Sequence, residues 1–127
     1  MTTIANALRD LLDREVPLNV AVDRHFAESY RQRTNGQWDD RGQFVTHIAH
    51  LRTIVDTIEL TVLEELVEGA VYAERHVADM KKKDGTRVVQ EVYVFGDRDS
   101  DGRFTRVEET TMMLEGAEAD RGIGNAR

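Results

Sequence analysis

The chain has 127 residues, 40% of them hydrophobic, which is enough for the core of one ordinary domain. It contains no cysteine, so disulfides, thiolate zinc sites and cysteine nucleophiles are excluded. The formal net charge of −7 opposes binding to nucleic-acid phosphates or anionic lipid. The first ten residues lack the pattern of a signal peptide, and no apolar run has the length of a membrane span. We therefore expect a cytoplasmic protein that binds neither nucleic acid nor membranes.

The first half of the chain carries helical signals. Thr3 is suited to cap a first helix, and Pro17 to occupy the first turn of a second one. A third helix begins where Asp40 and Gln43 form a capping box. Its apolar stripe consists of Phe44, Ile48, Leu51 and Val55.

The remaining segments read as β-strands. A short extended piece, 29–33, precedes the turn-forming Asn35-Gly36 pair. After the third helix, alternating or β-rich runs occupy 58–62, 71–80, 87–95 and 104–114. Helices followed by a meander of antiparallel strands predict an α+β fold in which the helices cover one face of a curved sheet.

Three segments carry a resemblance to a known family. Asp101-Gly-Arg-Phe-Thr-Arg-Val-Glu-Glu109 looks like a closing hairpin, Val92 to Phe95 like a penultimate strand, and Phe26 to Arg33 like a first strand. In these segments the chain resembles the nuclear transport factor two-like superfamily, and within it the SnoaL-like proteins. The resemblance implies a cone-shaped, curved antiparallel or mixed sheet with the N-terminal helices on its concave face. Residues 1–115 would form this domain, and residues 116–127 a flexible tail.

Two carboxylates are the first candidates for chemistry. By the resemblance, Glu109 lies where epoxide hydrolases of this fold keep a water-activating carboxylate. Glu91 matches the place where ketosteroid isomerases keep an oxyanion-stabilising acid, and Tyr93 on the same face is a candidate donor. A carboxyl group among apolar neighbours has a raised pKa, which suits a base or a neutral acid at neutral pH. The further pocket-lining residues expected on these two strands are Val107, Thr111 and Phe95.

The partner of these carboxylates depends on the Asp84-Gly85 hairpin. A two-residue turn would set His76 beside Tyr93, whereas a three-residue loop with a glycine bulge sets Arg75 near Glu91. We prefer the second, which makes Arg75 the anion stabiliser, and keep His76 as the alternative pocket residue.

Two residues depart from the family pattern, and three more residues complete the predicted pocket. Arg33 falls where isomerases of the family keep a proton-transferring aspartate, and Val77 replaces the aspartate of the epoxide hydrolase pattern. Both departures argue against those two reactions in their familiar form. The remaining pocket residues that we expect are Trp38, Phe44 and Ile48.

These features favour a pocket for a small organic ligand or substrate. The pocket carboxylates could serve as acid and base of a cofactor-independent isomerase, dehydratase, cyclase or hydrolase. The alternatives are non-catalytic binding of a hydrophobic ligand, a protein-interaction role, and a structural ion-pair network of Glu91, Glu109 and Arg75. We expect a homodimer formed through the outer sheet face, on which we place Val88, Val92 and Val94.

The segment from Asp97 to Glu108 also satisfies the spacing of a calcium-binding loop. That motif requires a helix on each side, whereas the flanking residues alternate as strands. We therefore predict an acidic hairpin loop and no metal site, with calcium binding by Asp97, Asp99, Asp101 and Glu108 as the alternative.

Overall fold

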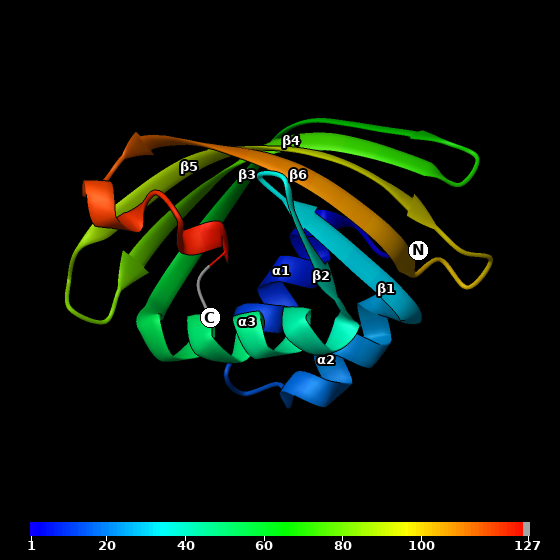
Figure 1. Ribbon diagram of the computed structural model, residues 1–127, viewed down its shortest axis with the longest axis horizontal. Coiled ribbons are helices and arrows are strands. Elements are labelled where there is room, and N and C mark those ends of the chain that lie inside the picture. The colour runs from blue at the N-terminus through cyan, green and yellow to red at the C-terminus, as the bar shows by residue number, and fades with distance from the viewer. Residues whose placement is uncertain (126–127) are drawn as a thin grey trace.

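The structure, a computed structural model, describes residues 1–125 (Figure 1). Its helices are α1 (Ile4–Leu12), α2 (Leu18–His25) and α3 (Arg41–Ile54), and two short 3-10 helices, η1 (Glu118–Asp120) and η2 (Ile123–Asn125), follow the last strand. Its strands are β1 (Phe26–Thr34), β2 (Gln37–Asp40), β3 (Val55–Glu68), β4 (Val71–Lys82), β5 (Arg87–Arg98) and β6 (Phe104–Glu115). None of the helices described is long and apolar enough to cross a bilayer.

The six strands form one curved sheet in the order β2-β1-β6-β5-β4-β3. Only the β1–β6 pair is parallel, and the other neighbours are antiparallel. The sheet arches over the three helices, which lie together on its concave side (Figure 1). This arrangement confirms the predicted α+β cone fold.

Local sequence signals explain where the helices begin. The Thr3 hydroxyl accepts a hydrogen bond from the backbone of Asn6, and Asp40 and Gln43 form the predicted capping box. Between β1 and β2, Asn35 and Gly36 adopt positive φ angles of 50° and 88°. The predicted turn therefore forms, and it leads into β2, a strand that the sequence analysis did not predict.

An aromatic cluster fills one end of the core. The Phe26 ring lies 4.5 Å from that of Tyr30 and 4.9 Å from that of Phe44, between centroids. Phe104 continues the cluster to Tyr72, with 5.2 Å between their centroids. These rings come from both helix and sheet, so their burial holds the two layers together.

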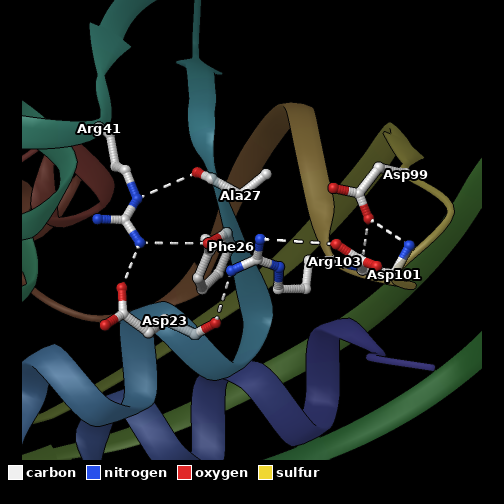
Figure 2. A network of polar contacts seen from close by, with 7 residues as sticks. All are labelled: Asp23, Phe26, Ala27, Arg41, Asp99, Asp101 and Arg103. Carbon is white, nitrogen blue, oxygen red and sulfur yellow. Dashed lines mark hydrogen bonds and ion pairs between the residues drawn. The ribbon is translucent and has the colours of Figure 1, made fainter.

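Two arginines stabilise the junction between α2 and β1, where the pairing of β1 with β6 is irregular (Figure 2). Arg41 donates from Nε to the Ala27 carbonyl at 3.1 Å, and from Nη2 to Asp23 Oδ1 at 2.7 Å and to the Phe26 carbonyl at 3.3 Å. Arg103 donates to the Asp23 carbonyl at 3.1 Å. Arg41 thus satisfies two carbonyls of β1 where its ladder with β6 is irregular and holds β1 against the start of α3, whereas Arg103 satisfies a carbonyl in the last turn of α2.

The segment expected to be a flexible tail packs against the domain as far as it is described. Ile123 is 6% exposed and belongs to the hydrophobic core. Lys82 Nζ lies 2.9 Å from Asp120 Oδ1, which ties η1 to the end of β4. One apolar side chain and one ion pair thus anchor a glycine-bearing segment. Residues 126 and 127 lie outside the described part of the chain.

Candidate functional site

A partly open pocket lies between the helices and the concave face of the sheet, with a volume of about 100 Å³. Most of its wall is apolar and comes from α1, α3 and the inner sheet face, with Ile123 and Gly124 of the C-terminal segment closing part of it. Its polar lining consists of Tyr30, Gln32, His47, His76, Gln90, Glu109 and Thr111. A mostly apolar cavity with few polar groups is typical of a small-molecule site.

Glu109 enters this pocket from β6 and is held by residues of β1. The Thr34 hydroxyl donates to Glu109 Oε1 at 3.1 Å, and Gln32 Nε2 donates to the same oxygen at 3.3 Å. The Tyr30 hydroxyl in turn donates to Gln32 Oε1 at 2.6 Å. Burial raises the pKa of the Glu109 carboxyl, and the hydrogen bond from Thr34 only partly offsets this effect. Glu109 is thereby suited to hold a proton closer to neutral pH than an exposed glutamate does.

A second titratable group faces the pocket from β4. Strand alternation directs Glu74 and His76 toward the helices, and both side chains are almost completely buried. His76 Nδ1 lies 2.6 Å from Glu74 Oε1. Because this contact occupies Nδ1, and no other hydrogen bond to His76 occurs within residues 1–125, Nε2 is the nitrogen available to a ligand.

The predicted register of the β4–β5 hairpin is confirmed, but the predicted inner face is wrong. Lys82 and Thr86 close a three-residue loop in which Gly85 has a φ of 89°, and this sets Arg75 opposite Tyr93. Tyr93 is nevertheless 45% exposed, because this face points away from the helices. His76, the alternative, is the residue that faces the pocket.

The inner face of β5 carries small β-branched side chains, contrary to the prediction. Val88, Val92 and Val94, which we placed on an outer dimer face, are buried in the core. Phe95, predicted to line the pocket, is 52% exposed on the outer face. The three helices fill most of the concave side, so short branched residues fit there while the aromatic residues of β5 lie outside.

The outer face gathers the remaining predicted site residues into a charged cluster. Arg75 Nε lies 2.6 Å from Glu64 Oε1 and its Nη1 lies 3.7 Å from Glu91 Oε1, while the Tyr93 hydroxyl donates to Glu91 Oε2 at 2.8 Å. Arg33 lies 3.3 Å from Glu108, and with Arg75 and Tyr93 it lines an open depression of about 810 Å³. Glu91, Tyr93 and Arg75 are therefore separated from the interior pocket by the sheet.

The other predicted lining residues divide between the two sides. Phe44, Ile48, Val107 and Thr111 lie in the wall of the interior pocket. Trp38 does not; it is largely exposed on the edge strand β2, where Arg31 lies over its ring at 4.8 Å.

Several known proteins resemble this chain in sequence or in fold. No family model matches the chain. An uncharacterized protein of Schizosaccharomyces pombe is 30% identical over 98 residues, which cover 77% of this chain and 75% of that protein. An LEH-like epoxide hydrolase of M. tuberculosis superimposes with a TM-score of 0.69 at 16% identity, covering 86% of this chain and 79% of that one. IdmH, a putative polyketide cyclase from Streptomyces antibioticus, superimposes with a TM-score of 0.66 at 14% identity, covering 87% and 88%.

A third solved structure is an NTF2-like protein of unknown function from Exiguobacterium sp. 255-15. It has a TM-score of 0.68 at 17% identity and covers 87% of this chain and 98% of that one. The chain has the fold of the nuclear transport factor two-like proteins, and its sequence places it in one family with the S. pombe protein. At these identities the solved structures establish the fold alone, so the chemistry of this chain has to be argued from its own residues.

The residues that match the calcium-loop pattern make other contacts in this fold. Arg106 Nε lies 2.7 Å from Asp97 Oδ2, and Arg106 also pairs with Glu108. Asp99 accepts backbone N–H groups from Asp101 and Arg103 at 2.9 and 3.2 Å. The segment is a hairpin loop between β5 and β6, with its would-be ligands bound by arginine and backbone. Among the residues that the structure describes, no group of three or more His, Asp or Glu side chains is placed to hold a metal ion.

Sequence reasoning missed the polar residues that surround Glu109 and His76. Tyr30, Gln32 and Thr34 alternate along β1, and this spacing was a usable signal for a shared face. Glu74 and Gln90 gave a weaker signal, since each lies in a strand whose two faces both contain apolar residues.

Proposed function

We propose that the interior pocket binds a small, mostly apolar organic molecule and moves a proton between two of its atoms. The observation that carries this proposal is that His76 and Glu109 line the same, mostly apolar cavity. Support also comes from proteins of similar fold, which include an LEH-like epoxide hydrolase, a putative hydroxylase and a putative polyketide cyclase.

His76 acts as the base in this proposal. Glu74 holds Nδ1 of the imidazole, which leaves the Nε2 lone pair free to remove a proton from a carbon of the ligand. Burial of the Glu74 carboxyl keeps this contact dry and the imidazole orientation fixed.

Glu109 acts as the acid at a second position. Its raised pKa favours the protonated carboxyl, which donates its proton to a ligand atom. Glu109 then regains a proton from water, and His76 releases to water the proton that it removed, so both groups return to their starting states. Glu109 lies on β6 and His76 on β4, with β5 between them and an offset of two residues along it, so their backbones are about 12 Å apart. This separation leaves room for a small ligand between the two side chains.

The size of the cavity limits the ligand. A volume of about 100 Å³ is below the roughly 150 Å³ of a cavity known to hold benzene. Cyclopentanone and the cyclopentenones have about six non-hydrogen atoms, as benzene has, so these ketones probe the upper size limit of the pocket.

Two readouts separate the roles of the two groups. We expect the protein to accelerate exchange of deuterium from D2O into the carbons next to the carbonyl of cyclopentanone, followed by NMR. We also expect it to convert the unconjugated cyclopentenone into its conjugated isomer, followed by ultraviolet absorbance. In the second reaction His76 removes a proton next to the carbonyl, the double bond shifts, and Glu109 delivers a proton to the remote carbon.

The variants predicted to separate these roles are His76→Gln and Glu109→Gln. His76→Gln loses both reactions, by about a hundredfold, whereas Glu109→Gln keeps the exchange and loses the isomerisation. Glu64→Gln, on the outer face, is the matched control and leaves both rates unchanged. If cyclopentanone binds and neither reaction is accelerated, the pocket binds ligands without catalysis. If cyclopentanone does not bind, the proposal that this pocket is a ligand site is refuted.

We also propose that two copies of the chain pair through the outer sheet face. This face exposes large apolar side chains together with both signs of charge, a composition suited to a self-complementary interface. The exposed apolar residues on the sheet strands include Leu66, Val71, Tyr93, Phe95, Met112 and Leu114. Sedimentation at micromolar concentration tests this second proposal, and a monomer contradicts it.

A further inference from the structure

Gln90 is a buried amide that faces the interior pocket without a partner for its N–H groups. The residue lies on β5, is 3% exposed and forms part of the pocket wall. Its Nε2 has no hydrogen-bond partner within residues 1–125. Buried donors are nearly always paired in native proteins, because an unpaired one loses its hydration and gains nothing in return.

The side chains directly opposite Gln90 supply no acceptor for its N–H groups. Its cross-strand partners are Ala78 on β4 and Met113 on β6, both without a strong acceptor in the side chain. By contrast, Gln32, the other amide of the pocket, donates from Nε2 to both Thr34 and Glu109. Of the two pocket amides, Gln90 is therefore the one whose donor is left open to a bound molecule.

We propose that Gln90 donates its Nε2–H to the carbonyl oxygen of the ligand and so makes the pocket selective for small neutral carbonyl compounds. This inference rests on the proposed function, since it assumes that a ligand enters the pocket. A neutral carbonyl fits better than a carboxylate, because the buried Glu74 carboxyl group and the mostly apolar wall disfavour a further anion nearby.

The register of the sheet sets the orientation of such a ligand. His76 pairs with Val92, so Gln90 is its diagonal neighbour across the β4–β5 ladder, with backbones about 7 Å apart. Glu109 pairs with Val94, which lies about 13 Å along β5 from Gln90. A carbonyl oxygen held by Gln90 therefore brings the adjacent carbon toward His76 and the remote end of the molecule toward Glu109.

The test compares cyclopentanone with methylenecyclopentane, which has nearly the same shape but no acceptor oxygen. Dissociation constants for both are measured by NMR titration of the wild type and of Gln90→Met. We expect the preference for the ketone to fall about three- to tenfold in the variant, the loss typical of one hydrogen bond. The infrared carbonyl stretch of bound cyclopentanone should lie at lower frequency in the wild type than in Gln90→Met.

Gln90→Met should fold, because it replaces an unpaired buried amide by an apolar side chain of similar length, and its melting temperature should equal or exceed that of the wild type. Gln90→Leu provides a second variant with the same expected loss of preference. Glu91→Gln, the next residue on the outer face, is the control and keeps the wild-type preference.

The outcomes distinguish this inference from the proposed function. If both probes bind and Gln90→Met leaves their ratio and the carbonyl stretch unchanged, the role of Gln90 is refuted while the pocket stands. If neither probe binds the wild type, the proposed function fails and this inference fails with it.

Discussion

His76 Nδ1 lies 2.6 Å from Glu74 Oε1, and the two side chains form a buried pair on the inner face of β4. Removing one member of such a pair leaves the other buried without its partner. We predict that Glu74→Ala lowers the free energy of unfolding by about 3 kcal/mol, measured by urea denaturation.

The control for this prediction is Glu64→Ala. Glu64 contacts Arg75 at the same 2.6 Å, but both side chains are solvent-exposed on the outer face. Solvent screens that pair, so the variant should unfold at nearly the wild-type urea concentration. Equal effects of the two substitutions would mean that burial does not strengthen the Glu74–His76 contact.

The raised pKa of Glu109 has a consequence for stability against pH. Burial holds the pKa of this carboxyl above its ordinary value of 4.5, so between the two values the folded protein binds more protons than the unfolded chain. Stability contributed by the protonated group is therefore present below pH 4.5 and is lost as pH rises toward the folded-state pKa. The loss cannot exceed about 1.4 kcal/mol per pH unit for one group.

Glu109→Gln removes this titration and supplies the measurement. We predict that the free energy of unfolding of the variant, relative to wild type, increases as pH rises from 4.5 and then becomes constant above the folded-state pKa. A difference that does not change with pH would contradict a raised pKa for Glu109.

Ile123 anchors the C-terminal segment over the pocket. We predict that Ile123→Ala weakens the packing of η1 and η2 on the domain, because the anchor loses most of its buried apolar surface. Amide hydrogen exchange in residues 118–125 should accelerate about tenfold or more, while exchange in the central strands stays unchanged. Glu118→Gln, an exposed change in the same segment, is the control, and unaltered exchange in Ile123→Ala would refute the anchoring role.

Phe95 tests the outer face as a dimer interface. Phe95→Glu introduces a carboxylate at the centre of the proposed contact, so we predict that micromolar protein sediments as a monomer while the wild type sediments as a dimer. Val20→Glu makes a comparable change at an exposed apolar residue of α2 and should leave the dimer intact. If both substitutions dissociate the dimer, or if neither does, the outer sheet face is not the dimer interface.

The sequence by itself determined most of the secondary structure. The Asp40–Gln43 capping box and the Asn35-Gly36 turn form as predicted, because their contacts join residues three or fewer positions apart. The glycine at position 85 likewise determined the three-residue hairpin and, through it, the pairing of Arg75 with Tyr93. The alternation of β6 also correctly directed Glu109 toward the interior.

The tertiary structure alone decided which side of β4 and β5 is the inside. Alternation establishes that Arg75, Glu91 and Tyr93 share a face, but not whether the helices cover that face or its opposite. Both faces of these strands carry apolar residues, so composition favoured the wrong face. His76 was therefore only the alternative pocket residue, and the buried Glu74 and Gln90 were not predicted to line the pocket. The packing of Ile123 is equally non-local, because its contacts are with residues distant in sequence. The pocket of this protein is therefore a product of layer packing, which no short stretch of sequence specifies.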